Sequence, residues 1–551
     1  MTRAGGFMVT TSRQLADEEG DHPRPDRSNT KVYLVGGGIA SLAAAAFLIR
    51  DAGVSGQNIT ILEELDRLGG SLDGSGSAKD GYLVRGGRMM ESKYQCTYDL
   101  FSSIPTLDKS QTVTQEILQW NEVLKTGSKS RLVRHGHKID GPDFGLAERH
   151  ILTLERLALE PEERLGRSSI EDHFDAAFFE TNFWLMWCTT FAFQPWHSAA
   201  EFKRYLVRFV HMVDGFNRLK GIMRTYYNQY DSLVRPLKAW LDERGVSTIF
   251  GAKVTDVNFS KSSGGKSVES IVVNVGGRTD EIAIGTEDYV IVTLGSMTDS
   301  SSVGTNATAA MLNGKREGSA WELWEKIADG KPEFGNPSAF DDHIDDSKWL
   351  SFTTTQRDPA FFDIVRNFTG NVPGEGGLIT FADSSWLMSI VLPHQPHFTG
   401  QPEGVNVFWG YGLYVDKRGD FVDKPMAACS GAELLTEVLG HLGIGSEAAR
   451  ILESSTTIPC MMPFITSQFL RREKGDRPNP VPEGWRRLGF VGQFVELPDD
   501  VVFTVEYSIR SAQSVVAKLF DLDCGPPSVY KGEFDPRVLF RAFTALHDFH
   551  I

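Results

Sequence analysis

The hydrophobic positions near the N-terminus follow the order strand, tight turn, helix. A short apolar run at 32–35 leads into the triple glycine at 36–38, and the Ala-rich segment at 43–49 then has the composition of a helix. A second apolar strand is predicted at 59–62. Units of this kind build parallel sheets whose faces are covered by helices. We therefore predict an α/β fold that begins with a Rossmann-like unit.

The glycine-rich turn has the spacing of a dinucleotide fingerprint. In Gly36-x-Gly38-x-x-Ser41 the first glycine permits the sharp turn, and the second lets backbone approach a pyrophosphate. The helix that follows offers free N–H groups and a partial positive charge to the phosphates. Ser41 is small enough for close packing of the helix on the strand. Glycine-rich turns without a ligand share this spacing, so neighbouring residues must decide the interpretation.

Residues after the second strand narrow the cofactor to FAD. Glu63 ends that strand, where an acidic side chain can bind ribose hydroxyls. Arg67, Gly70 and Ser71 follow within EELDRLGGS. This Glu-x3-Arg-x-Gly-Gly arrangement is typical of FAD proteins and unusual in NAD proteins. The sequence therefore predicts an FAD-binding domain.

Three later segments complete the predicted FAD site. RGGRMME contains a second glycine pair, which in FAD folds commonly lets backbone pass beside the flavin; a surface hairpin turn is the alternative. YVIVTLGS is a buried strand, and the last long helix is predicted to begin near Thr504 or Val505, with its N-terminal donors toward the flavin ring. The candidate residues in these segments are Gly86, Gly87, Arg88, Thr293, Ser296, Phe503 and Thr504.

Changes of periodicity along the chain predict a discontinuous Rossmann-like domain with inserted substrate-binding domains. Between 168 and 241 apolar residues recur at helical spacing, as at Phe174, Ala177 and Phe178, and Phe and Trp are unusually frequent. Most of these side chains are core, and some are expected to line an apolar cavity. The predicted parts are a disordered tail at 1–29, an FAD-binding domain at 30–130, 245–340 and 485–523, a helical region at 131–244, a mixed-sheet domain at 341–484 and a C-terminal tail or helix at 524–551.

Composition and charge restrict the partners. The chain has 551 residues and a formal net charge of −16 at pH 7, which argues against nucleic acid because its phosphates would be repelled. Five scattered cysteines show no metal-ligand spacing, which favours reduced thiols and no metal site. The first 29 residues have no apolar signal core, and the aromatic run at 182–193 is too short to span a bilayer. We predict a cytoplasmic protein.

The C-terminal segment has the pattern of a small amphipathic helix. We expect this helix to pack on the body of the protein or to rest on a membrane surface. Its apolar residues are Val538, Leu539, Phe540, Phe543, Leu546 and Phe549.

Several long motifs, taken together and in order, resemble the oleate hydratases, also called the myosin-cross-reactive antigen family. The resemblance runs from about 31 to 519 and is carried by RGGRMMESKYQCTYDLFSSIPTL, TTFAFQPWHSAAEFKRYLVRF, YYNQYDSLVRPL, LPHQPHF, PCMMPFITSQF, GDRP and FVGQFVELPDDVVFTVEYSIRSA. It implies hydration of the cis-9 double bond of oleate and similar long-chain unsaturated fatty acids to a 10-hydroxy fatty acid. The implied reaction is redox-neutral, with FAD organising the site.

The resemblance also implies roles for single residues. The proton-donating tyrosine of the family falls on Tyr205, and the two carboxylate-anchoring residues fall on Gln229 and His397. Without the resemblance, core packing is the simpler interpretation of Tyr205. The water-activating acidic position falls on Met89, which cannot accept a proton. Two further polar positions of the carboxylate clamp are Val391 and Pro393 here, and His394 is a candidate to assist.

Two other functions are compatible with these residues. One is an FAD-dependent oxidoreductase of the amine-oxidase or desaturase type, which shares the Rossmann half. The other is a non-catalytic fatty-acid-binding flavoprotein, which Met89 makes conceivable. A hydratase is distinguished from both because it forms product without an electron acceptor. The proline-broken N-terminal stretch favours a monomer over a homodimer.

Overall fold

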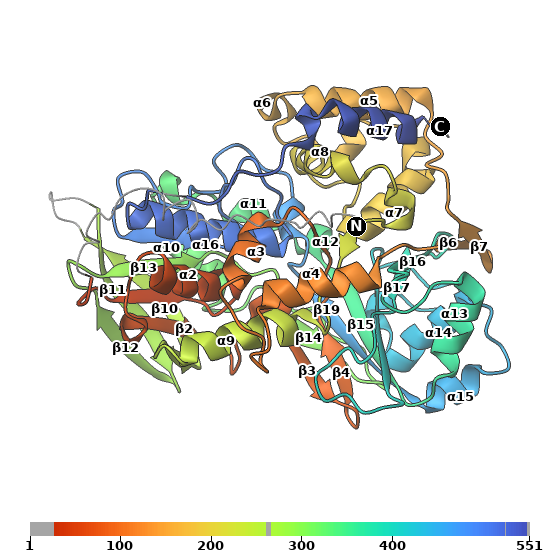
Figure 1. Ribbon diagram of the computed structural model, residues 1–551, viewed down its shortest axis with the longest axis horizontal. Helices are drawn as coiled ribbons and strands as arrows, with labels where there is room; N and C mark the ends of the chain where they lie inside the picture. The colour runs from red at the N-terminus through yellow and green to blue at the C-terminus, as the bar shows by residue number, and fades with distance from the viewer. Residues whose placement is uncertain (1–26, 261–265, 524, 548–551) are drawn as a thin grey trace, which may run out of the picture.

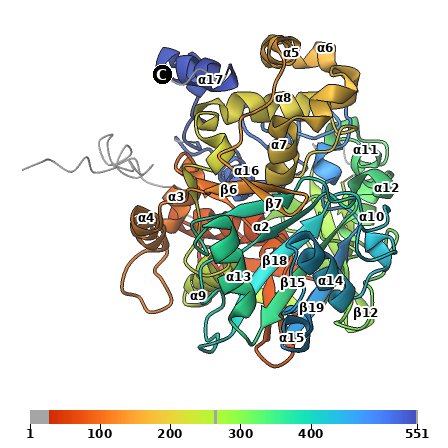
Figure 2. The same ribbon diagram turned by 90° about the vertical axis from the view of Figure 1, so that its right-hand side faces the viewer.

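The computed structural model describes residues 27–260, 266–523 and 525–547 and has two sheet-based halves beneath a layer of helices (Figures 1 and 2). The predicted tail lies outside the described residues up to position 26. One half contains a parallel sheet with helices α2 and α16, the other contains a large mixed sheet with α13, α14 and α15, and helices α5 to α8 with α17 lie above the second half (Figure 1).

The N-terminal pattern forms the predicted strand, turn and helix at the centre of a five-stranded parallel sheet. Val32 in the first strand pairs with Ile59 on one side and with Tyr289 on the other. The strand order is β20 (Leu488–Val491), β13 (Tyr289–Thr293), β1 (Val32–Val35), β2 (Ile59–Glu63) and β9 (Ser247–Phe250). Since neighbouring strands come from distant parts of the chain, the Rossmann-like domain is discontinuous, as predicted.

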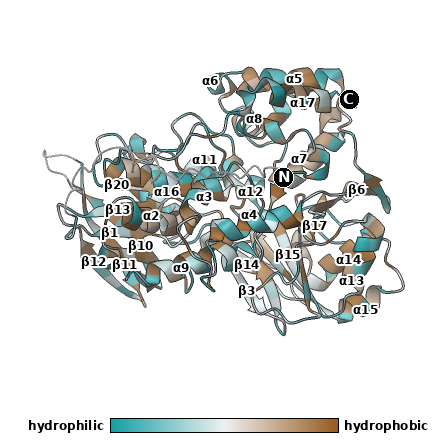
Figure 3. Ribbon diagram, in the orientation of Figure 1, coloured by the Kyte–Doolittle hydropathy of each residue, from teal (hydrophilic) through white to brown (hydrophobic). Residues whose placement is uncertain are grey.

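Helix α2 (Ile39–Arg50) is apolar around most of its circumference because it packs between the sheet and other helices (Figure 3). Residues 39–48 of this helix are all buried. Helix α16 (Val505–Leu519) lies beside it and begins with Thr504 as its N-cap, at the predicted position. The N-termini of both helices therefore lie near the glycine-rich turn.

The second half is built on an eight-stranded mixed sheet. Its central strand β15 (Trp349–Gln356) is buried at every position. The remaining strands, in order along the sheet, are β14 (Ser302–Val303) and β19 (Ser455–Met462) on one side, and β18 (Asn406–Gly412), β17 (Met388–Val391), β16 (Leu378–Phe381), β6 (Ser130–Arg134) and β7 (His137–Asp140) on the other. Thus β14, β6 and β7 enter this sheet from outside the predicted 341–484 segment.

Smaller sheets and the remaining helices complete both halves. The smaller sheets comprise β10 (Ala252–Phe259), β11 (Val268–Val275) and β12 (Arg278–Ala283); β3 (Gly74–Ser77) and β4 (Gly81–Val84); and β5 (Met90–Glu91) with β8 (Ile222–Met223). The other helices are α3 (Gln95–Phe101), α4 (Val113–Leu124), α9 (Arg235–Asp242), α10 (Ala320–Ala328), α11 (Ser338–Asp341), α12 (Ile344–Ser347), α13 (Ala360–Thr369), α14 (Gly431–His441) and α15 (Ala448–Glu453).

The helical layer contains α5 (Glu148–Leu159), α6 (Glu162–Leu165), α7 (Asn182–Phe191) and α8 (Ala199–Arg208). The prediction of an α-helix through Phe174 and Phe178 is wrong, because Asp175 caps a short 3-10 helix at Ala176–Glu180 instead. The predicted helical region also begins with the β6–β7 hairpin, whose pairing with β16 is a long-range contact that local periodicity does not encode.

The C-terminal segment forms α17 (Pro536–Leu546), which contacts the short helix at Val210–Met212. Leu539, Phe540 and Phe543 remain exposed on it, and Phe549 lies outside the described residues.

Within the described ranges, none of the helices has the length and apolar character needed to cross a membrane. The cysteines at 96, 188, 429 and 460 are buried and form no disulfide.

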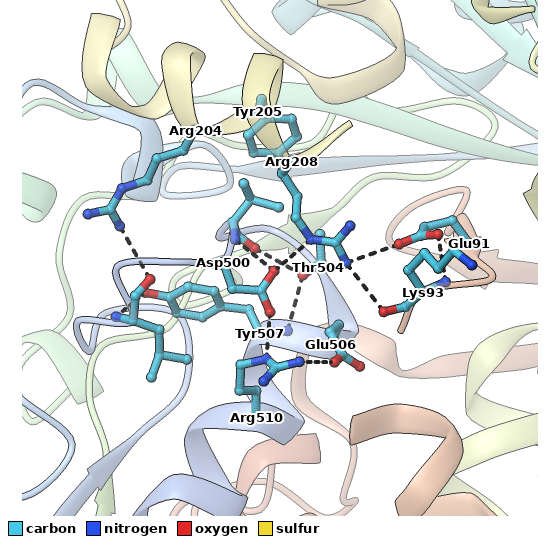
Figure 4. A network of polar contacts seen from close by, with 12 residues as sticks. Glu91, Lys93, Arg204, Tyr205, Arg208, Asp500, Thr504, Glu506, Tyr507 and Arg510 are labelled. Carbon is cyan, nitrogen blue, oxygen red and sulfur yellow. Dashed lines mark hydrogen bonds and ion pairs between the residues drawn. The ribbon is translucent and has the colours of Figure 1, made fainter. Parts of the chain in front are cut away.

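A buried ion network joins the helical layer to the Rossmann-like half (Figure 4). Arg208 on α8 contacts Glu91 of β5 at 3.0 Å and Asp500 at 3.3 Å. Arg510 on α16 contacts the same Asp500 at 2.9 Å and Glu506 at 2.9 Å. Each of these side chains is almost completely buried, so the network fixes α8, β5 and α16 relative to one another.

We predict that Glu506→Gln strongly destabilises the protein. The Glu506 carboxylate also accepts hydrogen bonds from the backbone N–H groups of Cys96 and Thr97, both at 2.9 Å, so the neutral amide loses several charge-assisted contacts at once. Breaking a buried ionic network of this kind costs about 3–5 kcal/mol. Calorimetric unfolding measures the change as a lower Tm. The matched control Glu243→Gln removes the exposed ion pair with Lys109, which is worth less than about 1 kcal/mol. Equal Tm changes in the two variants would contradict the prediction.

Candidate active site

A groove at the carboxyl ends of β1, β2 and β13 holds the largest group of predicted cofactor residues. Ligands of open α/β sheets bind at this edge, beyond the ends of parallel strands. The groove has a volume of about 410 Å³. Its lining includes the predicted residues Gly36, Gly38, Glu63, Gly70, Ser71, Thr293 and Ser296.

The two glycine loops form one wall of this groove. The Gly69 backbone N–H donates to the Gly37 carbonyl at 2.9 Å, so the loops lie directly against each other. Gly36 has a φ of +90°, which side chains rarely adopt. A Cβ added to Gly38 would meet no protein atom within 4 Å, so the space in front of it is open. No side chain caps the N-terminus of α2, which leaves backbone donors available for an anion.

Glu63 ends β2 inside the groove. Its carboxylate accepts hydrogen bonds from the backbone N–H of Gly37 at 2.6 Å and of Leu65 at 2.8 Å. Burial raises the pKa of Glu63 above its usual value, and the backbone donors oppose that effect. The same N–H groups therefore orient an acidic side chain where a dinucleotide ribose would lie.

Ser41 and Arg67, also predicted as cofactor residues, do not line the groove. Ser41 is buried, and its Oγ lies 3.0 Å from Thr293 Oγ1, which ties α2 to β13. Arg67 Nε lies 3.3 Å from Asp66 on a partly exposed side chain. Ser41 thus packs α2 against β13, as its size predicts, whereas the Arg67 side chain contacts Asp66 and is not part of the groove lining.

A second cavity of about 100 Å³ brings together residues from four separate motifs. It shares Ser71, Met297, Gln493 and Ser508 with the groove, so the two spaces adjoin. Its lining includes the predicted residues Gly87, Arg88, Met89, Tyr205, Gln229, Phe503 and Thr504. The RGGR segment is therefore interior lining and not the alternative surface hairpin.

Arg88 and Gly87 lie at the centre of this lining. Arg88 donates to the Ser71 carbonyl at 2.8 Å, and its guanidinium lies 5.9 Å from the Phe503 ring centre. Burial lowers the pKa of Arg88 to about 10, and nearby Asp73 partly offsets the effect. A Cβ on Gly87 would approach Trp409 to 2.9 Å, so glycine is needed for the backbone to pass beside that ring.

Tyr205 projects from α8 into an aromatic environment beside the second cavity (Figure 4). Its side chain is only 1% exposed, and its hydroxyl donates to the Val502 carbonyl at 2.6 Å. The Phe191 and Phe193 rings lie 5.0 Å from the Tyr205 ring. Burial raises the pKa of Tyr205 well above its usual value, so the phenol keeps its proton at neutral pH.

Met89 lines the second cavity and supplies neither a proton acceptor nor a donor. Glu91 also lines it but is engaged by Arg208 and by the Lys93 N–H at 2.6 Å. Although burial acts to raise it, the pKa of Glu91 lies below its usual value because His211 and Arg208 stabilise the carboxylate. Tyr94 also lines this cavity.

A third cavity of about 50 Å³ contains the predicted anchoring residues Gln229 and His397, together with Gly86. The Asn228 N–H donates to the His397 carbonyl at 2.9 Å, which joins the YNQY and HQPH motifs. Gln229 also lines the second cavity. Burial, assisted by nearby positive charge, lowers the pKa of His397 to about 3, so the imidazole is neutral at physiological pH. Sequence reasoning missed one lining residue, Arg224, which stands just before the YYNQYDS motif.

Comparison with known proteins shows one family over nearly the whole chain. The MCRA family model matches residues 29–517. An oleate hydratase of Streptococcus pyogenes serotype M49 (strain NZ131) is 38% identical over 529 residues, which cover 94% of this chain and 89% of that protein. A linoleate hydratase of Lactiplantibacillus plantarum is 32% identical over 570 residues, which cover 94% of this chain and 99% of that protein.

Solved structures with a similar fold include two amine oxidases. Putrescine oxidase bound to putrescine has a TM-score of 0.51 and 13% identity, covering 89% of this chain and 99% of its own. Cyclohexylamine oxidase from Brevibacterium oxydans IH-35A has a TM-score of 0.50 and 13% identity, covering 90% and 99%. At this identity the likeness shows a shared fold and nothing about the reaction.

We predict that Gly38→Ala selectively weakens dinucleotide binding. The new methyl group meets no protein atom but occupies the space in front of the α2 N-terminus. Binding of FAD, measured by titration of the apoprotein, should weaken about 10-fold or more, which corresponds to roughly 1.4 kcal/mol. The Tm of the apoprotein should change little, because an N-cap substitution costs about 1 kcal/mol or less. Undiminished FAD affinity in a folded variant would contradict the placement of the pyrophosphate here.

Proposed function

The chain belongs to the MCRA family, and from that premise we propose that it is a hydro-lyase that adds water to the cis-9 double bond of oleate and related long-chain unsaturated fatty acids. One observation carries the proposal: Tyr205, the Met89 position and Gln229, taken from three distant motifs, line one buried cavity. That cavity adjoins the groove on one side and the His397 cavity on the other. The arrangement suits a long ligand whose middle carbons face a phenol.

FAD is the proposed occupant of the groove. Glu63 is placed to accept ribose hydroxyls, and the open N-terminus of α2 is placed to accept the pyrophosphate. Thr504 and Phe503, at the start of α16, line the neighbouring cavity where the ring system would end. When bound, the flavin would complete the wall of the reaction cavity, and hydration itself requires no net electron transfer.

The phenol of Tyr205 is proposed as the proton donor. An isolated alkene is a very weak base, so a neutral acid must be held against one carbon in a site that excludes water. The phenolic proton moves to one alkene carbon, the oxygen of water bonds to the other, and a proton from that water returns to the phenolate oxygen. The net change is the addition of one water molecule. Arg208, one turn further along α8, lowers the cost of the transient phenolate.

Methionine at position 89 removes the family's water-activating carboxylate from this cavity. Other oxygen-bearing side chains line the space, among them Tyr94, Glu91, Gln229 and Thr190. These groups can hold a water molecule by hydrogen bonds, although the Glu91 carboxylate is already committed to Arg208. We therefore propose that protonation of the alkene by Tyr205 drives the reaction. The water molecule is held in position by hydrogen bonds, and no carboxylate at position 89 removes its proton.

A flavin-dependent oxidase is the second candidate, because the predicted FAD-binding residues that line the groove would serve such an enzyme equally well. An oxidase changes the oxidation state of its substrate and consumes an electron acceptor, whereas a hydratase does neither. Anaerobic incubation with oleate and FAD, followed by mass spectrometry, separates the two. A product heavier than oleate by one water supports the hydratase, and an oxidised product supports the oxidase.

We predict that Tyr205→Phe lowers kcat for oleate hydration by roughly 100-fold or more, the usual range for loss of a general acid. The substitution keeps the ring packing against Phe191 and Phe193, so the Tm should stay close to that of the wild type. Steady-state formation of 10-hydroxystearate measures the effect. Full activity in the folded variant would rule out Tyr205 as the acid.

We also predict that Met89→Glu raises kcat by about 10-fold, because the restored carboxylate can accept a proton from water. The isosteric control Met89→Gln polarises water without accepting its proton and should give a smaller gain. The pH profile distinguishes them, since only Met89→Glu should lose its gain as the pH falls through the carboxyl pKa. A decrease in kcat for Met89→Glu would contradict this interpretation of position 89.

A further inference from the structure

The structure assigns a substrate-anchoring role to Arg224, and we propose that its guanidinium binds the carboxylate of the fatty acid in the third cavity. This inference rests on the proposed function, and it concerns substrate recognition and not the chemical step. Arg224 supplies the positive charge that the predicted clamp of Gln229 and His397 lacks. A charged anchor also explains how the clamp can tolerate apolar residues at two of its positions, Val391 and Pro393.

Hydrogen bonds to α4 fix the backbone of Arg224, and with it the position of its Cα and Cβ atoms. Arg224 follows β8 directly, and its N–H donates to Asn121 Oδ1 at 2.9 Å. The Asn121 amide donates in return to the Arg224 carbonyl at 2.8 Å and to the Ile117 carbonyl at 2.7 Å. Helix α4 thus fixes the position from which the guanidinium extends into the lining of the third cavity.

The guanidinium of Arg224 is buried and has no counter-ion among the described residues. The residue is only 8% exposed, and neither Nε nor Nη2 has a hydrogen-bond partner in the described part of the chain. Most other buried arginines have a carboxylate partner: Arg208 and Arg510 belong to the ion network, and Arg85 Nε lies 2.7 Å from Asp73. Arg131, which has none among the described residues, donates instead to the Phe216 carbonyl at 2.7 Å and to the Thr190 hydroxyl at 2.8 Å. An uncompensated buried cation costs several kcal/mol, which an anionic ligand would offset.

The surroundings of Arg224 select a carboxylate in preference to a neutral group. Burial lowers the pKa of Arg224 to about 10, so the guanidinium is still charged at neutral pH. His397 is neutral there, since burial and the charge of Arg224 lower its pKa to about 3. A guanidinium offers a planar pair of donors that matches a carboxylate, and neutral neighbours can donate further hydrogen bonds.

The location of Arg224 matches the shape of the proposed substrate. The third cavity shares Ser71, Gly87, Arg88 and Gln229 with the cavity that contains Tyr205. A carboxylate at Arg224 therefore leaves the acyl chain directed past Gln229 toward the phenol. The contact between Arg224 and the carboxylate would then fix how far the acyl chain reaches into the cavity, so that one double-bond position lies against the Tyr205 phenol.

The experiment compares two ligands that differ only in the head group, oleate and oleyl alcohol, on the apoprotein and on the FAD-loaded protein. Arg224→Gln should weaken oleate binding by about 10-fold or more, which is the loss expected for a charge-assisted hydrogen bond. Oleyl alcohol binding should change less than about 3-fold. Arg224→Lys should recover part of the oleate affinity. The control Arg218→Gln removes an exposed arginine from the neighbouring loop and should leave both ligands unaffected.

Further readouts separate anchoring from a structural role. In steady-state hydration, Arg224→Gln should raise the KM for oleate more than it lowers kcat. The Tm of ligand-free Arg224→Gln should not fall, because the variant removes a lone buried cation. A clear fall in Tm, equal losses for oleate and oleyl alcohol, or unchanged oleate affinity would each overturn the inference. Failure of the wild-type protein to hydrate oleate, with selective oleate binding still lost in Arg224→Gln, would instead contradict the proposed function alone.

Discussion

The buried ion network between Arg208, Asp500 and Arg510 is the constraint on which the site depends. Helix α8 carries Tyr205, β5 follows Met89, and the N-terminus of α16 faces the second cavity, yet these elements come from three distant parts of the chain. Glu91 and Glu506 extend the network to β5 and α3. Because each charge is buried, none can leave the network without a large cost, and the elements are held in one relative position.

Buried charges in this protein differ in whether a carboxylate neutralises them, and Arg131, which has none among the described residues, donates to the Phe216 carbonyl and the Thr190 hydroxyl. Charges within the network are neutralised by partners and hold the scaffold together. Arg224 and Arg88, by contrast, line the cavities without a direct carboxylate partner within the described residues. Burial lowers the pKa of both toward about 10. Charges left uncompensated at a cavity wall are available to a ligand, and their spacing along the cavities suits a long amphipathic anion beside a dinucleotide.

Local sequence patterns were sufficient for the features that depend on neighbouring residues. The strand, the glycine turn and α2 follow one another directly, so their order, the position of Glu63 at the end of β2 and the start of α16 could be predicted from the sequence. The resemblance between motifs then indicated Tyr205, Gln229 and His397, which line adjoining cavities. Features that depend on distant contacts could not be read in this way. The β6–β7 hairpin joins a remote sheet, and the segment after Phe174 forms a 3-10 helix at Ala176–Glu180 instead of an α-helix. Arg67 is not part of the groove lining, and no local sequence pattern distinguishes Arg224 from an ordinary surface arginine.

In the proposed reaction, the buried phenol of Tyr205 and a water molecule meet at a double bond without net oxidation. The most direct test is anaerobic incubation of the FAD-loaded protein with oleate in heavy-oxygen water, with the product analysed by mass spectrometry. The account predicts a hydroxy acid that carries one heavy oxygen atom and is otherwise at the oxidation level of hydrated oleate. An oxidised product, or recovery of oleate unchanged by protein that binds it, would contradict the account.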